Sequence, residues 1–142
     1  MKMAKFNRIL CVGLFALFSI CSVSAQKHEV KVVIDNVKSL NGKIYVAVFK
    51  DGNMKFLEEH QVDAACVSPK IGSVEVSFSL PSAKYAFVAF QDENGNMEMD
   101  SNWIGYPKEP FALSTDNLIP TYKAAEVDVS DSITVTLTLR GN

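Results

Sequence analysis

The sequence predicts an all-β protein, a single β-sandwich of the immunoglobulin or transthyretin type with about seven strands. Three observations support this prediction. Apolar and polar residues alternate at the two-residue period of a half-buried strand, turn-forming Gly, Pro, Asn and Asp separate these runs, and no long segment repeats its apolar residues at helical spacing. Regularly spaced short strands with turns between them are typical of a sandwich.

The first half of the chain supplies two predicted strands. Val30, Val32 and Ile34 alternate with less apolar residues, so a strand with one buried face is expected to end near Asn36. Asn41–Gly42 marks a turn. The run 44–49 that follows is apolar at every position, which predicts a strand covered on both faces.

Three further strands follow after a less regular stretch. Residues 54–61 are compatible with a short helix or an irregular connection, and 68–72 form a loop. The segment 74–80 alternates most regularly, 85–90 is apolar on both faces, and 133–139 alternates again to form the last strand.

The N-terminal residues resemble a leader. Three basic residues precede the apolar stretch 9–20, and small residues lead to Ala25. This pattern predicts a signal peptide over 1–25 and one β-sandwich domain over 26–142. A retained membrane anchor and lipid attachment at Cys21 are the alternatives. We expect an exported protein, periplasmic, envelope-associated or secreted, with no transmembrane segment in the mature chain.

The charge of the mature chain limits its partners. The whole chain has 14 basic and 16 acidic residues, and the leader contains three of the basic ones. The mature chain therefore has 11 basic and 16 acidic residues and a net charge of −5. Nucleic-acid binding depends on clustered Lys and Arg, so it is not expected. Cys66 is the only thiol outside the leader, and its small apolar neighbours predict a buried side chain.

The segment 92–100 carries the clearest chemical signal. Oxygen-bearing side chains recur at every second position, at Asp92, Asn94, Asn96, Glu98 and Asp100. This is the spacing of ligands in a calcium loop, and calcium prefers such oxygen donors. Calcium is therefore the expected cofactor.

The calcium pattern is incomplete. Met97 stands where an EF-hand has Gly, and Trp103 stands where it has a bidentate Glu, so an EF-hand is excluded. A further ligand would have to come from elsewhere, and Glu109 is the best candidate. The alternative is a metal-free polar loop, because Asn and Gly are also common where the backbone turns.

The stretch from Leu80–Pro81 to Ser114 resembles a bacterial family known as domain of unknown function 2141. The matching motifs are Leu80–Pro81, Tyr85–Ala86, Asp92 to Asn96 with Asp100, and Gly105-Tyr106-Pro107-Lys108-Glu109. The chain departs from the family at Gln91, where a His is common. The resemblance implies an exported, transthyretin-like β-sandwich and no established reaction.

Aromatic residues supply a second candidate site. Trp103, Tyr106 and Phe111 either form a surface for a protein or glycan partner or cover one end of the sandwich. Tyr85 follows Leu80–Pro81 and is expected to act as a tyrosine corner, with its hydroxyl bonded to nearby backbone.

Catalytic signatures are absent from the sequence: it has no nucleophile elbow, phosphate loop or Cys–His motif. We therefore expect a non-enzymatic binding or accessory module with a calcium-ordered loop. The alternatives are a purely structural envelope-associated domain and, less well supported, a small hydrolase that uses the loop carboxylates.

Overall fold

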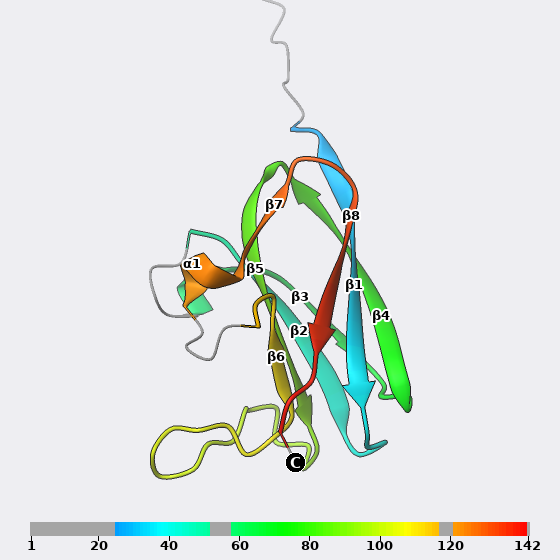
Figure 1. Ribbon diagram of the computed structural model, residues 1–142, viewed down its shortest axis with the longest axis vertical. Helices are drawn as coiled ribbons and strands as arrows, with labels where there is room; N and C mark the ends of the chain where they lie inside the picture. The colour runs from blue at the N-terminus through cyan, green and yellow to red at the C-terminus, as the bar shows by residue number, and fades with distance from the viewer. Residues whose placement is uncertain (1–24, 52–57, 117–120, 142) are drawn as a thin grey trace, which may run out of the picture.

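The protein is a sandwich of two β-sheets, as the sequence predicts (Figure 1). The computed structural model describes residues 25–51, 58–116 and 121–141. A three-stranded sheet has the order β4-β1-β8, formed by Gly72–Pro81, Lys27–Val37 and Ile133–Thr138. A five-stranded sheet has the order β3-β2-β5-β6, with β7 also paired to β5, formed by Gln61–Val67, Lys43–Phe49, Ala83–Asp92, Phe111–Leu113 and Glu126–Val129.

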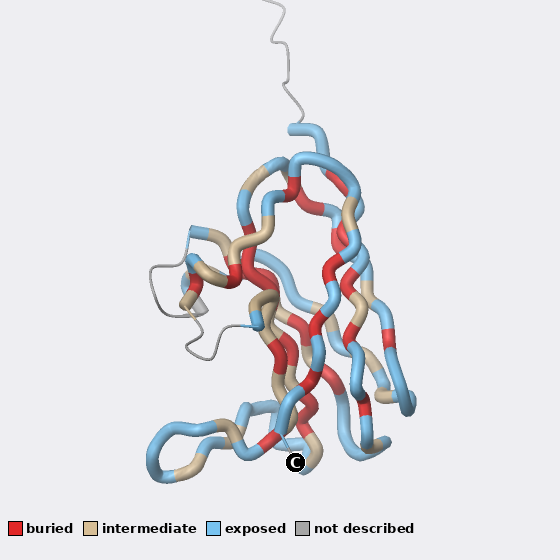
Figure 2. Tube along the Cα trace, viewed as in Figure 1, coloured by how far each residue is buried: buried red, intermediate tan, exposed pale blue. Residues whose placement is uncertain are grey.

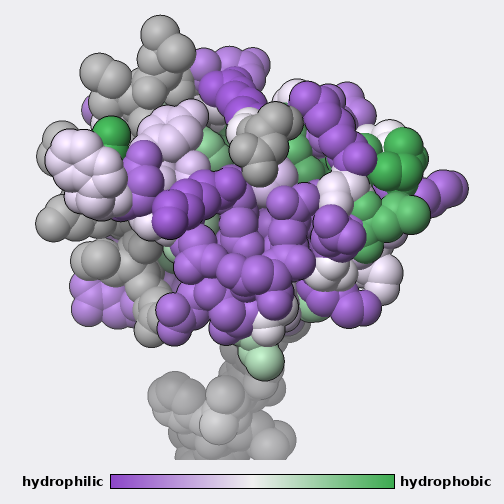
Figure 3. All heavy atoms as spheres, turned by 90° about the horizontal axis from the view of Figure 1, so that it is seen from below, coloured by the Kyte–Doolittle hydropathy of each residue, from purple (hydrophilic) through white to green (hydrophobic). Residues whose placement is uncertain are grey.

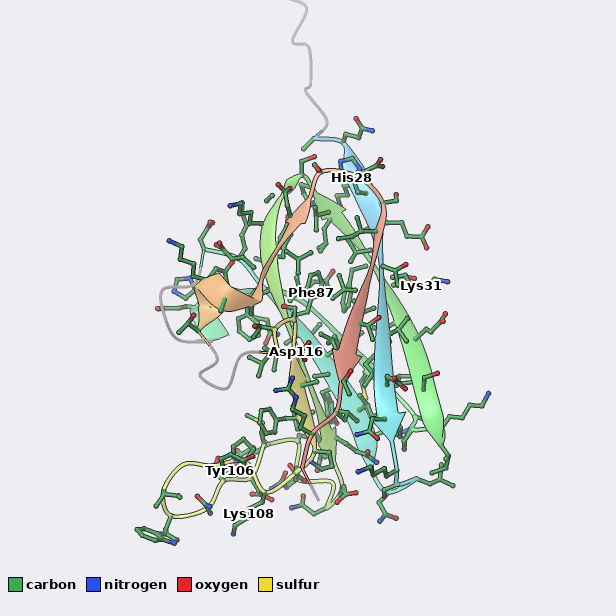
Figure 4. The ribbon with its side chains drawn as sticks, in the orientation of Figure 1. His28, Lys31, Phe87, Tyr106, Lys108 and Asp116 are labelled. Carbon is green, nitrogen blue, oxygen red and sulfur yellow. The ribbon has the colours of Figure 1, made fainter. Side chains whose placement is uncertain are left out.

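The core lies between the two sheets, where the inward side of each alternating strand is buried (Figure 2). β1 contributes Val30, Val32 and Ile34, all fully buried, which confirms the first predicted strand. From the five-stranded sheet, the ring of Phe87 lies 6.4 Å from that of Phe78 across the core, and Figure 4 shows Phe87 between the sheets. Burial of such side chains contributes about 1.5–3 kcal/mol each.

Neighbouring strands pair antiparallel, with one exception. β1 pairs with β8 in parallel, from Val30 opposite Ile133 to Asp35 opposite Thr138. At the start of β5, the Tyr85 hydroxyl donates a hydrogen bond to the carbonyl of Pro81 at 2.9 Å, so the predicted tyrosine corner is confirmed. Partial burial and the carboxylate of Asp51 raise the pKa of Tyr85, which keeps this donor protonated.

The outer face of the three-stranded sheet is polar. Its outward positions are Ser, Thr and charged residues except for Val33 and, at the end of β4, Pro81. Lys31 forms a surface ion pair with Glu75 across β1 and β4 at 3.5 Å. This face therefore has the usual character of a solvated sheet surface.

The outer face of the five-stranded sheet is apolar and only partly covered. The strand predicted over 44–49 exists as β2, but Tyr45 and Ala47 are half-buried rather than enclosed. The short helix α1, Tyr122–Ala125, covers the upper part, where Tyr122 and Ala125 pack on Phe49. The expectation that β2 is buried on both faces is therefore wrong for its lower half.

Two other expectations need correction. Within 54–61, residues 54–57 lie outside the described part of the chain, and Glu58–His60 form a 3-10 turn, η1, that leads into β3. Cys66 is exposed on β3, so the predicted burial is wrong. The reason is that β3 is an edge strand, and the outward position of Cys66 faces solvent beside Tyr45.

The predicted signal peptide lies almost wholly outside the described residues. Among the residues that are described, no helix is both long enough and apolar enough to cross a membrane.

Candidate functional site

The segment between β5 and β6 projects from one end of the sandwich, on the side where α1 lies (Figures 1 and 2). It consists of two parts. The Asp/Asn loop, residues 92–100, begins at the last residue of β5, and the finger, residues 100–108, extends beyond it. Seen from this end, the surface is mostly hydrophilic, with hydrophobic spots at its margin (Figure 3).

Two nearly buried carboxylates close the Asp/Asn loop. Asp92 is 1% exposed, and its two oxygens accept hydrogen bonds from the N–H groups of Gly95 (2.7 Å) and Met97 (2.9 Å). Glu109 is 5% exposed and accepts from Glu93 (3.0 Å) and Asp100 (3.3 Å), at opposite ends of the loop. Backbone N–H groups thus take the role that water would play for an exposed carboxylate.

The remaining loop side chains converge on Asp100. The side-chain oxygens of Asn94 and Asn96 accept N–H groups of Asn96 (3.0 Å) and Glu98 (2.9 Å). These turns orient both amide nitrogens toward the carboxylate of Asp100, to which they donate. The loop therefore satisfies its own polar groups, as Asn and Asp do in local turns.

The base of the loop is locked to the turn between β1 and β2. The side chain of Gln91, 1% exposed, donates to the carbonyls of Ser39 and Asn41, each at 2.9 Å. Gly42 has φ +67°, and a Cβ there would lie 1.6 Å from the carbonyl oxygen of Asp92. Only glycine fits this close approach.

Met97 adopts a strained backbone conformation at φ +64°. A residue without β-branching pays of order 1 kcal/mol for this left-handed conformation. The site where an EF-hand has Gly thus has the backbone conformation that glycine favours, although the side chain is Met. The Met97 side chain is 74% exposed, so packing does not explain why Met stands there.

The finger is a tight hairpin with an uncharged apolar tip. Backbone hydrogen bonds join its arms, from Lys108 to Asp100 and from Asn102 to Tyr106, both at 2.8 Å. The side-chain oxygen of Asn102 accepts from Ile104 (3.1 Å) and Tyr106 (2.9 Å). The tip is held rigidly although Trp103 is 96% exposed and Ile104 66% exposed.

An aromatic row connects the finger to the uncovered sheet face. Tyr45 on β2, Phe90 on β5 and Phe111 on β6 are successive cross-strand partners. The rings of Tyr45 and Phe90 stack 5.3 Å apart, and Tyr106 meets Phe111 edge-on at 6.2 Å; Tyr106 is labelled on the finger in Figure 4. Partial burial, then Cys66, raises the pKa of Tyr45.

A groove of about 530 Å³ lies above this row. It exists because Ala47 and Ala64 are cross-strand partners, so two small side chains lie side by side on the outer face. Tyr45, Phe90, Met97 and Met99 line the groove, as does Phe49 two residues beyond Ala47 on β2. The polar residues Gln61 and Glu98 also line it. The groove is of a size that small-molecule sites commonly have.

The predicted site residues are thus only partly brought together. Asn94, Asn96 and Asp100 converge, but through amide nitrogens, whereas Asp92 and Glu109 bind backbone and Glu98 is exposed at the groove. In the described part of the chain, no three His, Cys, Asp or Glu side chains are placed to hold a metal ion. A calcium ion between these residues would require both Asn amides to rotate and release their backbone partners.

The aromatic residues do not cover the end of the sandwich. Trp103 and Tyr106 are 96% and 57% exposed, and only Phe111 is half-buried, so that alternative is wrong. The residues that sequence reasoning missed are those of the groove and the loop base, Gly42, Tyr45, Ala47, Ala64, Gln91, Met97 and Met99. The two-sided apolar run 44–49 was the available signal for an outward apolar face.

Comparison with known proteins identifies the family. No curated protein and no solved structure is detectably similar to the chain. Residues 32–136 match the family described as an uncharacterized protein conserved in bacteria, DUF2141. The match runs from the middle of β1 through most of β8 and includes the whole Asp/Asn loop and finger. The chain belongs to this bacterial family, as the motifs around Asp92 to Glu109 predict.

Proposed function

We propose that this protein is an exported, non-enzymatic binding or accessory module, and that its ligand surface is the outer face of the five-stranded sheet together with the finger. One observation carries the proposal: an apolar groove that the described residues leave open is continuous, through Tyr45, Phe90 and Phe111, with the exposed finger. Contiguous exposed apolar surface on a soluble domain is typical of interaction sites.

The rigidity of the loop supports this function. A surface that stays ordered before its partner arrives loses less conformational entropy on binding. The carboxylates of Asp92 and Glu109 hold the loop from below, and Asn102 holds the finger tip. The strained backbone of Met97 places a flexible side chain at the groove wall, and strain of this kind often accompanies function.

The same contacts argue against catalysis by the loop carboxylates. Asp92 and Glu109 each accept two backbone N–H groups and are nearly buried, so neither is presented to a substrate. A general acid or base must reach the proton that it transfers. We therefore propose a structural role for both side chains.

Site-specific photo-crosslinking in the exporting cell tests the proposed surface. A photoreactive residue replaces Tyr106 on the finger, and in a matched variant it replaces Lys31 on the polar outer face of the three-stranded sheet (Figure 4). We expect discrete adducts from position 106 and none from position 31. Adducts from both positions alike, or from neither, would contradict the proposal.

Calcium ordering of the Asp/Asn loop is a second proposal, supported by the donor spacing of Asp92, Asn94, Asn96 and Asp100. Extracellular calcium modules bind with Kd of about 10⁻⁴–10⁻³ M, so millimolar calcium would stabilise the fold by roughly 0.4–1.4 kcal/mol. Titration calorimetry on wild type and Asp100→Ala measures this. Equal, negligible heats from both proteins would leave the metal-free, hydrogen-bonded loop as the correct account.

A further inference from the structure

The groove and the finger tip are complementary in chemistry, although both belong to one chain. Ala47, Ala64 and Val88 lie side by side in the groove, and aromatic and thioether side chains also line it. The finger tip offers an aromatic ring and a branched aliphatic side chain, Trp103 and Ile104. Aromatic and methionine side chains are favourable partners for an inserted indole ring.

Charge and hydrogen bonding are also compatible with insertion of the tip. Residues 101–107 contain no charged side chain, so no charge would be buried with them. The indole N–H of a buried Trp needs an acceptor. Gln61 and Glu98, which line the groove, carry side-chain oxygens that can accept it.

We propose that the finger of one copy of this protein docks into the groove of a second copy, so that Trp103 and Ile104 cover Ala47 and Ala64. This inference rests on the proposed function and names its partner. A second copy is favoured because this chain itself carries a tip that complements the groove, so that one contact between copies buries apolar surface of both kinds.

The position of the two surfaces allows a reciprocal contact. The finger and the uncovered sheet face lie on the same side of the sandwich, below α1 (Figure 1). Two copies related by a two-fold axis can therefore exchange fingers and form a closed dimer. Without the predicted leader, residues 1–25, each copy has a net charge of −5, so salt should strengthen the association by screening the repulsion. A basic foreign partner would show the opposite salt dependence.

Three variants test the finger tip and the groove separately. Trp103→Ala removes the aromatic ring of the finger tip. It also leaves the protein without tryptophan, because Trp103 is the only tryptophan in the sequence. Ala64→Phe fills the groove from an exposed edge strand, where a larger side chain is tolerated. Thr136→Phe, on the exposed polar face of the three-stranded sheet, is the matched control.

Sedimentation velocity of the processed protein over a micromolar concentration series gives the dimer Kd. We expect wild type and Thr136→Phe to dimerise alike, and Trp103→Ala and Ala64→Phe to weaken the dimer by about thirtyfold or more, as expected for loss of a tryptophan hot spot. An equimolar mixture of the two weakened variants should associate more tightly than either alone, because it restores one intact finger and one intact groove.

Tryptophan fluorescence of that mixture reports on the docked finger alone. Trp103→Ala contributes no tryptophan emission, so a blue shift must come from Trp103 of the Ala64→Phe protein entering the groove of Trp103→Ala. A protein that is monomeric at every concentration, or a dimer that Trp103→Ala leaves unchanged, overturns the inference. A blue shift only with phosphatidylethanolamine–phosphatidylglycerol vesicles overturns it in favour of a lipid partner. If the protein stays monomeric but position 106 still crosslinks to other proteins, self-docking fails and the binding surface stands.

Discussion

The two outer faces of the sandwich have the same alternating backbone and opposite surfaces. On the three-stranded sheet the outward positions carry Ser, Thr and charged side chains, and Lys31 pairs with Glu75. On the five-stranded sheet they carry Tyr45, Ala47 and Phe90, and a hydrogen-bonded finger projects beside them. Solvation alone explains the first face. The second is explained by the partner that we propose, since contiguous exposed apolar surface on a soluble domain is typical of interaction sites.

Among the variants that compare the two sheets, Gly42→Ala should have the largest effect on the free energy of unfolding. The new Cβ would lie 1.6 Å from the carbonyl oxygen of Asp92, the last residue of β5. The base of the Asp/Asn loop must therefore move. We expect a loss of more than about 4 kcal/mol in the free energy of unfolding, measured by urea denaturation.

Gly72→Ala is the control on the three-stranded sheet. Gly72 has a similar left-handed backbone, φ +97°, but no atom lies within 4 Å of the position that a Cβ would take, so only backbone strain of about 1–3 kcal/mol is expected. Equal losses in the two variants would show that the contact between Gly42 and Asp92 is unimportant.

Glu109→Gln should have the next largest effect. The amide retains one oxygen acceptor, so one of the N–H groups of Glu93 and Asp100 loses its partner in a buried position. We expect about 1–3 kcal/mol of destabilisation by thermal or urea unfolding. Glu75→Gln, which breaks only the exposed ion pair with Lys31, should cost less than about 1 kcal/mol. Similar losses in both variants would contradict the structural role of Glu109.

Phe90→Thr makes the apolar face resemble the polar one. Phe90 is half-buried and stacks on Tyr45, so we expect a loss of about 1–2 kcal/mol together with loss of partner adducts at position 106. Val33→Thr, at an apolar position on the opposite outer face, should cost less than about 1 kcal/mol and leave adducts unchanged. Unchanged adducts in Phe90→Thr would show that the finger binds the partner without the sheet face, which contradicts a joint binding surface.

Met97→Gly should have the smallest effect on stability. Relief of the left-handed strain and the greater freedom of an unfolded glycine oppose each other, so we expect a change within about 1 kcal/mol, with stabilisation the expected sign. Binding should weaken because the groove loses part of its wall. A destabilisation of about 2 kcal/mol or more, roughly twice the strain, would show that the Met97 side chain holds the loop.

The sequence predicted the sandwich because alternation and turn residues are local signals. Val30 to Ile34 and Val74 to Leu80 could be assigned from their own pattern, and the family motifs identified the loop. The short strands β3, β6 and β7 were missed. In β3, Ala64 and Ala65 have little strand preference, and they pair because β2 lies beside them.

The candidate site was only partly predictable, because its geometry depends on contacts between segments that are separate in the sequence. The spacing of Asp92 to Asp100 reveals which side chains carry oxygen, but the local turns at Asn94 and Asn96 decide which atom faces Asp100. The groove depends on the register that places Ala47 opposite Ala64. Register between separated strands has no signature in either strand alone.

Cysteine labelling compares the two faces in the working protein most directly. In a Cys66→Ser background, Ala64→Cys places a thiol in the groove and Thr136→Cys places one on the polar face; both native residues are exposed. Maleimide labelling rates are measured in the exporting cell and in dilute purified protein. We predict that labelling at position 64 is much slower in the cell than in dilute solution, while position 136 is labelled equally fast in both. Equal rates for position 64 in the cell and in dilute solution would contradict the claim that the apolar face is covered when the protein functions.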